Sequence, residues 1–280
     1  LTEIGKNEFI ARNFYLTGGT ALAGFYLGHR YSEDLDFFSE TEFDIIQIDI
    51  AIKKIKEKLG ISKIDFQQSY NRNLFFLHFG KEVIKTEFTY FPFARIKKGK
   101  KEYGIQIDSL LDIAVNKLFS IYQRTQARDY IDLYAIAKEK KYTVGELIKK
   151  AKIKFDWHID PLQLGTQFIK AKEAKDYPRM ILELHTDEVE KFFLEEAKKL
   201  KRRYFEAQQA YYQPQPKIII ATPFYELKGF SPYIKSLTET TRLLQAVGIN
   251  YEFMELSGDS YVHRARNSMC MAFLDDPYAT

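Results

Sequence analysis

Two carboxylates stand one residue apart in the segment SEDLDFF, at Asp34 and Asp36. In a strand they would lie side by side, while Leu35 and Phe37 face the other way. Neighbouring carboxylates repel each other unless a cation lies between them. Hard oxygen ligands suit Mg²⁺ or Mn²⁺, and such a metal also binds nucleotide phosphates. The pair predicts a divalent-metal site; a surface turn with incidental acids is the alternative, against which the apolar neighbours argue.

A phosphate-binding turn is predicted just before this pair. The stretch NFYLTGGTALAGFYLG indicates a short strand, a turn at Gly18 and Gly19, and a helix, with Thr17 or Thr20 near the helix start. Glycines let the backbone approach a ligand closely, and the free N–H groups of a helix's first turn attract anions. A tight turn without a ligand is the alternative, and a bare Gly-Gly pair does not decide between them.

A third acid stands on a predicted strand further along the chain. EVIKTEFTYFPF alternates, which puts Glu87 on one face with Lys85 and Thr89. Glu87 could join the two aspartates at the metal or be an ordinary exposed acid.

A helical stretch supplies a lysine and further acids. DSLLDIAVNKLFSIYQRTQARDYIDLYAIAKEKK has a cap at Asp108 or Ser109 and a helical apolar stripe beside Lys117. This lysine can neutralise a triphosphate, and Asp132 can anchor basic side chains around it. Either one helix runs through the stretch, or polar residues 123–127 break it and Asp129 starts a second helix. An amphipathic helix with surface salt bridges is the remaining alternative.

The elements that must position these residues fit an ordinary globular chain. Its 280 residues, 45% of them hydrophobic, can bury a sizeable core in one large or two modest domains. A helix-patterned stretch at 188–212 runs into QPQP at 213–216, whose alternate prolines stop a helix and favour an extended linker. We predict a domain at 1–212, with a core at about 10–110 and a helical part at about 109–212, then a linker at 213–216 and a segment at 217–280.

Composition narrows the partners and the compartment. The net charge of +4 permits a polyanionic partner without demanding one. The sequence has no run of eighteen apolar residues and no secretion signal, so it indicates no membrane association. The single cysteine, Cys270, excludes an internal disulfide and fits a reducing cytoplasm, where we expect the protein. The missing initial methionine suggests trimming or a fragment.

Taken together, LTGGTALAGFYLGHRYSEDLDFF, the strand acid Glu87 and NKLFSIYQRTQARDYIDLY resemble the nucleotidyltransferase toxins of the AbiEii/AbiGii type, over about residues 14–200. The resemblance implies an α/β (α+β) fold with the mixed sheet of polymerase-β-like nucleotidyltransferases and a helical C-terminal part. It also implies a toxin of a toxin–antitoxin or abortive-infection system, which transfers nucleotides from an NTP to RNA such as tRNA and has a cognate antitoxin partner.

The same resemblance assigns roles to residues of this chain. The expected catalytic residues are Asp34, Asp36, Lys117, Asp129 and Asp132, of which Asp129 or Asp132 matches the acidic position of the family's RDxxDL pattern. The expected nucleotide-binding residues are Gly18, Gly19, Thr20 and Lys117, and the expected ligands of Mg²⁺ or Mn²⁺ are Asp34, Asp36 and Glu87. The chemistry implied is in-line phosphoryl transfer from a metal-held triphosphate.

The C-terminal segment has a different predicted fold. Residues 217–280 predict strand, loop, helix, strand, loop and helix, a partial Rossmann-like βαβα segment. They resemble the opening of family-2-like glycosyltransferases of the GT-A type at 221–224 and 264–267. In that family the metal-binding Asp-x-Asp lies on the next strand, beyond Thr280. Asp275 and Asp276 do not substitute for it, because adjacent strand residues face opposite ways.

The sequence is therefore compatible with three functions. The first is an active, metal-dependent nucleotidyltransferase toxin. The second is a catalytically inactive binding module for an antitoxin, in which the acids hold no metal. The third is a fragmentary glycosyltransferase acting through residues 217–280, which the missing metal motif argues against.

Overall fold

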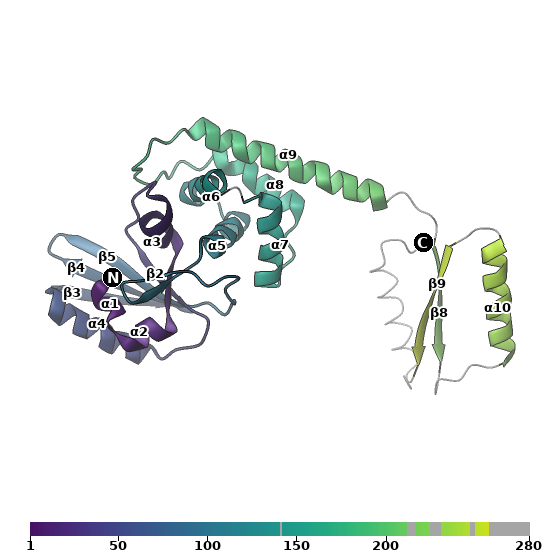
Figure 1. The fold of residues 1–280 in the computed structure, drawn as a ribbon, viewed down its shortest axis with the longest axis horizontal. Coiled ribbons are helices and arrows are strands. Elements are labelled where there is room, and N and C mark those ends of the chain that lie inside the picture. The colour runs from purple at the N-terminus through teal and green to yellow at the C-terminus, as the bar shows by residue number, and fades with distance from the viewer. Residues whose placement is uncertain (141, 212–216, 225–230, 247–249, 258–280) are drawn as a thin grey trace. The chain divides into compact units, whose positions relative to one another are not determined.

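The computed structural model describes residues 1–140, 142–211, 217–224, 231–246 and 250–257 (Figure 1). The chain forms two compact units, Leu1–Lys201 and Arg202–Thr280. The elements that begin in the first unit are α1 (Thr2–Gly5), α2 (Glu8–Asn13), β1 (Tyr15–Thr17), α3 (Gly18–Leu22), the π-helical η1 (Ala23–Leu27), β2 (Leu35–Ser39), α4 (Ile45–Leu59), β3 (Lys63–Ser69), β4 (Arg72–Phe79), β5 (Glu82–Tyr90), β6 (Lys101–Glu102), β7 (Ile105–Ile107), α5 (Leu110–Gln123), α6 (Ala127–Lys140), α7 (Val144–Phe155), α8 (Pro161–Ile169), the 3₁₀ turn η2 (Lys170–Lys172) and α9 (Thr186–Tyr211).

A seven-stranded mixed sheet is the centre of the first unit. Its strand order is β3-β4-β5-β2-β1-β7-β6. β2 pairs in parallel with β5, and β1 in parallel with β7, while β1 and β2 are antiparallel. The register puts Asp36 of β2 directly opposite Thr17 on one side and Glu87 on the other. Directly opposite residues share a face of the sheet, so these three side chains point the same way. The mixed α/β architecture predicted from the sequence is confirmed.

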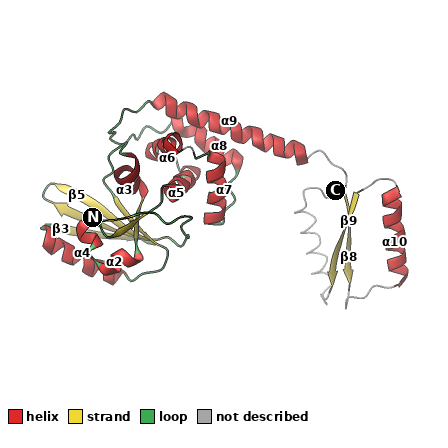
Figure 2. Cartoon of the chain, in the orientation of Figure 1, coloured by secondary structure: helices red, strands yellow, loops and turns green. Residues whose placement is uncertain are grey.

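Helices cover both faces of this sheet. Figure 1 shows α4 on one side with α1 and α2, and α5 to α8 gathered on the other side; Figure 2 shows the same layers by type of element. α4 begins where the Asp44 side chain accepts a hydrogen bond from the N–H of Ile46, and it ends at Gly60 in the left-handed conformation. Its apolar stripe is buried, and on the same side of the sheet Phe37 stacks on Phe88 with ring centroids 5.1 Å apart.

The helical stretch after β7 is two helices, which decides between the two alternatives left by the sequence. The Ser109 hydroxyl caps α5 by accepting from the N–H of Asp112 at 3.0 Å, as predicted. Arg124 is extended, with φ −152° and ψ 161°, and therefore ends the helix. α6 then starts at Ala127, whose N–H donates to Asp176 at 2.9 Å. The break lets α6 turn back along α5, so Lys117 meets acids of the following helix.

The second unit contains a parallel βαβ arrangement. Its elements are β8 (Lys217–Phe224), α10 (Ser231–Ala246) and β9 (Asn250–Ser257), and β8 pairs in parallel with β9. This confirms the first strand, helix and second strand predicted there. The predicted linker at 213–216, the final helix, the glycosyltransferase-like 264–267 and both Asp275 and Asp276 lie outside the described residues. Across the described ranges, none of the helices combines the length and apolarity that a membrane span requires.

Candidate active site

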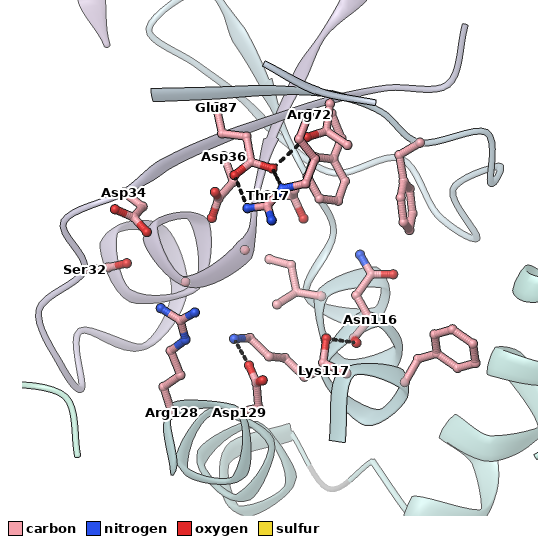
Figure 3. A pocket seen from close by; sticks show the side chains of 18 of the residues that line it. Thr17, Ser32, Asp34, Asp36, Arg72, Glu87, Asn116, Lys117, Arg128 and Asp129 are labelled. Atoms are coloured by element: carbon pink, nitrogen blue, oxygen red, sulfur yellow. Dashed lines mark hydrogen bonds and ion pairs between the residues drawn. The ribbon is translucent and has the colours of Figure 1, made fainter. Parts of the chain in front are cut away.

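A cavity of about 440 Å³ opens beside the carboxylates, between the sheet and the helices α5 and α6 (Figure 3). Six cationic and four acidic side chains line it, and this excess of positive charge suits an anionic ligand such as a triphosphate. The charged lining residues are Arg30, Arg72, Lys85, Lys117, Arg124, Arg128, Asp34, Asp36, Glu87 and Asp129.

Gly18 and Gly19 lie in the wall of this cavity, at the start of α3. β1 ends at Thr17 and α3 starts at Gly18, so the strand and the helix predicted on either side of the glycine turn are confirmed, with no loop between them. Gly18 has φ +71°, and a Cβ there would come within 2.5 Å of an Asp36 carboxylate oxygen. A Cβ on Gly19 would meet the Arg30 guanidinium at 2.5 Å. Both positions therefore need glycine because charged groups approach the backbone closely.

The three predicted metal ligands line the same cavity, with different partners. Asp36 and Glu87 lie on strands, but Asp34 lies just before β2, whereas the sequence had suggested a place on the strand. Lys85 Nζ donates to Asp34 at 2.8 Å. Arg72 donates two hydrogen bonds of 2.6 Å to Glu87 and, although burial alone would raise the pKa of Glu87, these bonds help to hold it below the usual value. Asp36 accepts no hydrogen bond and forms no ion pair with any described residue. Burial, followed by the charges of Glu87 and Asp34, raises the pKa of Asp36 to about 6.

The three carboxylates differ from a preformed metal site in one respect. In the described part of the chain, no three His, Cys, Asp or Glu side chains converge on a common point where an ion could bind. Two of the three acids form ion pairs instead, Asp34 with Lys85 and Glu87 with Arg72. The donor chemistry nevertheless fits a divalent cation. The carboxylate oxygens are hard ligands. Burial first, and then the charges of Glu87 and Asp34, raise the pKa of Asp36, which has no partner among the described residues, and a bound cation would offset both effects.

Behind the cavity, a buried cluster is centred on Asp132, which is fully buried. His29 Nε2 lies 2.8 Å from its carboxylate, Arg30 donates to both its oxygens at 2.7 and 2.8 Å, and Lys117 Nζ is 2.8 Å away. Lys117 also donates to Asp129 at 2.7 Å. Burial alone would raise the pKa of Asp132, but Lys117 and Arg30 hold it well below its usual range.

The same cluster keeps Lys117 positively charged. Burial would lower the pKa of Lys117, but Asp132 and Asp129 outweigh it and raise the pKa above the ordinary value. Lys117 therefore stays charged at the cavity wall, with Asp129 beside it in the lining (Figure 3).

Two predicted site residues do not reach the cavity. Asp132 is not in its lining, so it is better described as a positioning residue for Lys117 and Arg30 than as a catalytic one. Thr20 is also outside the lining; its hydroxyl donates to the backbone carbonyl of Asp34 and so holds the loop before β2. The sequence-based assignment of Thr20 to nucleotide binding is not supported by this placement, because its hydroxyl is already used within the protein.

The structure adds cavity residues that sequence reasoning did not select. They are Arg30, Ser32, Arg72, Arg128, Asn116 and several phenylalanines. Arg128 could have been found, since it immediately precedes the matched Asp129. Arg72 carried no local signal, because its place beside Glu87 comes from the pairing of β4 with β5. Figure 3 shows Arg128 reaching toward the Asp34 side of the cavity, and its Nε donates to Gln126 Oε1 at 3.2 Å.

A buried acid next to the site makes the pH dependence of stability testable. Asp108 is fully buried, accepts from the Thr17 hydroxyl at 2.7 Å, and burial raises its pKa to about 7. From about pH 4 to about pH 7 the folded protein keeps this proton while the unfolded chain releases it, so Asp108 lowers stability as the pH rises through that window. Asp108→Asn should therefore gain stability over wild type across the window, by up to ~4 kcal/mol, with no further gain above it.

Urea unfolding of both proteins between pH 4 and pH 8 measures this difference. Asparagine can keep the bonds to Thr17 and to the N–H of Ser109, so packing is retained. A difference between the two proteins that does not change with pH would contradict a raised pKa at Asp108.

Comparison with family models identifies one family. Residues 6–218 match the family model described as nucleotidyl transferase AbiEii toxin, type IV TA system. The chain is 31% identical over 191 residues to the uncharacterized protein aq_aa25 of Aquifex aeolicus (strain VF5), a match covering 68% of this chain and 88% of that protein. Among solved structures it is similar to JHP933 from Helicobacter pylori (TM-score 0.48, 20% identity, 74% of this chain, 91% of that chain). It is also similar to the polyadenylate synthase of Megavirus (TM-score 0.36, 16% identity, 49% and 30%).

Proposed function

This chain belongs to the AbiEii nucleotidyltransferase toxin family, and from that premise we propose that it transfers a nucleotide from an NTP to an RNA acceptor, with tRNA as the substrate to test first. Membership makes the protein a nucleotidyltransferase and implies an NTP substrate and an antitoxin partner. The inactive binding module considered from the sequence is therefore not adopted. The acceptor and the metal requirement are the parts of the proposal that experiment must supply.

The observation that carries the proposal is the position of Asp36. Its carboxylate lies between Glu87 and the backbone of Gly18, without a partner in the described parts of the chain, in a cavity with an excess of cations. Retaining a repelled carboxylate at that place costs stability, and such groups concentrate at functional sites. A site for a metal-bound triphosphate accounts for the acids and the cations together.

Residues on one side of the cavity would hold the metal, and a residue on the other side would bind phosphate. Asp34 and Asp36 would hold Mg²⁺ or Mn²⁺, with Glu87 beside them; such a metal stabilises charge on the triphosphate and lowers the pKa of the attacking hydroxyl. Lys117, kept charged by Asp129 and Asp132, would bind phosphate oxygens from the α5 side.

The cations beside these residues also have a proposed part in binding. Arg128 has no acidic partner among the described residues, so its guanidinium is available to a phosphate. Arg72 and Lys85 would exchange a carboxylate for phosphate oxygens as the ligand and metal enter. This exchange would free the carboxylates of Asp34 and Glu87 to face the metal.

RNA as the acceptor rests on the resemblance of the motifs and on charge. The net charge of +4 and the basic cavity are compatible with a polyanionic acceptor. Nothing in the comparisons supports sugar transfer by residues 217–280, and we do not include it in the proposal.

Transfer of labelled nucleotide tests the proposal directly. Each of the four NTPs is offered with Mg²⁺ or Mn²⁺, together with total tRNA and with the protein alone. Labelled tRNA that requires the metal is the expected result. Label on the protein itself would move the acceptor from RNA to protein. No label with any NTP, metal or RNA would overturn the proposed reaction.

A further inference from the structure

One half of the cavity is aromatic instead of charged. Five phenylalanines from β2, the segment after β5, α5 and α7 line it: Phe38, Phe91, Phe93, Phe119 and Phe155. Phe119 stacks on Phe155 with centroids 4.0 Å apart, and Phe93 meets Phe155 at 5.0 Å. Phe38 meets Phe91 at 4.7 Å. The rings form a continuous wall, and their faces and edges suit a flat aromatic ligand.

A polar group without a partner lies on this side. Neither Oδ1 nor Nδ2 of Asn116 is accessible to solvent, and neither has a hydrogen-bond partner among the described residues. Figure 3 shows the Asn116 amide directed from α5 into the space beneath the sheet. The residue as a whole is half-buried and lines the cavity, so a change of its side-chain rotamer would bring the amide to a bound ligand. A buried amide with both groups unpaired lowers stability, and its retention calls for a reason.

The neighbouring residue connects this wall to the triphosphate side. Lys117 follows Asn116 on α5, and both side chains line the same cavity. We propose that the aromatic half binds the base of the incoming NTP and that Asn116 recognises the hydrogen-bonding edge of that base; this rests on the proposed function. An amide offers one donor and one acceptor side by side, which complements the adjacent donor and acceptor on a base edge.

The test measures ligand affinity in the absence of RNA, with a divalent metal, for wild type, Asn116→Ala and Asn116→Asp. The ligands are the four NTPs and inorganic tripolyphosphate, which has no base. Asn116→Ala should weaken the preferred NTP by about 5- to 150-fold, the range expected for a lost bidentate contact to a base. Its affinity for tripolyphosphate should be unchanged, because the charged half of the cavity is intact.

Asn116→Asp adds a change in selectivity that a general loss of structure would not produce. A carboxylate offers two acceptors, which complement the adjacent N1–H and N2–H donors of guanine. The variant should therefore bind GTP better, relative to the other NTPs, than wild type does. Asn13→Ala is the matched control, since Asn13 is an exposed residue at the end of α2 that does not line the cavity. The thermal midpoint of Asn116→Ala should be at or above that of wild type, because an unpaired buried amide is removed.

The outcomes separate this inference from the proposed function. If wild type binds the NTPs and Asn116→Ala binds each of them with the wild-type affinity, the role of Asn116 in recognising the base is overturned. If a separate titration with tRNA shows weaker binding by Asn116→Ala while its NTP affinity is unchanged, the base of the acceptor binds there instead, which also overturns the inference. If wild type binds neither NTP nor tripolyphosphate, the proposed function itself fails.

Discussion

Asp36→Asn should lower nucleotidyl transfer by about 10³-fold or more, an effect on the barrier of roughly 4 kcal/mol. The carboxylate is the acid that lies in register with Glu87 and against Gly18, so no other side chain replaces its charge. Asparagine keeps the shape and removes the charge that would hold the metal and the triphosphate. The measurement is the rate of label transfer at saturating NTP and metal.

The same substitution should make the protein more stable. Burial and the charges of Glu87 and Asp34 raise the pKa of Asp36 to about 6, so above that pH the folded protein holds an ionised carboxylate at a cost. A carboxyl group whose pKa is raised in the folded state lowers the stability of the protein as the pH rises from about 4 to about 6, and this loss of stability is complete above that range. At pH 8 the variant should therefore gain roughly 1–3 kcal/mol in urea unfolding.

Loss of activity with a gain in stability distinguishes a functional acid from a structural one. Asp49→Asn is the matched control, because Asp49 is an exposed acid on α4 paired with Lys53. It should change neither transfer nor stability appreciably. Transfer by Asp36→Asn at the wild-type rate would show that Asp36 does not take part in the reaction.

Asp132→Asn should destabilise the first unit by about 3–5 kcal/mol, since it leaves buried cations without their shared carboxylate. His29, Arg30 and Lys117 all contact Asp132, and none of these side chains is more than one-tenth exposed. The pKa of Asp132 is held well below its usual range, so its contribution is present above about pH 4 and is lost as the pH falls further. Chemical unfolding at pH 8 measures the loss.

A surface ion pair provides the comparison for this prediction. Glu188 accepts from Lys138 and Tyr134 at an exposed position, so Glu188→Gln should unfold close to wild type. A loss at Asp132→Asn no larger than that at Glu188→Gln would show that the buried cluster does not support the fold.

Local pattern was enough to predict the elements of the site and several of its residues. Alternation predicted the strands that carry Asp36 and Glu87, and a serine before an apolar stripe predicted the start of α5. These features depend on side-chain periodicity and capping within one segment, which a sequence displays directly. The order of the motifs also carried the resemblance that the family match confirms.

Partners contributed by distant segments could not be predicted in this way. Three features depend on strand order and on the break between α5 and α6. They are the pairing of Arg72 with Glu87, the contacts of Asp132 with His29, Arg30 and Lys117, and the wall formed by phenylalanines of four segments. Periodicity states which face a side chain occupies but not which strand lies beside it. The sequence by itself therefore determined the types of chemical group and the elements that carry them. Only the tertiary structure decided which of those groups meet, because long-range contacts select among pairings that local pattern leaves equal.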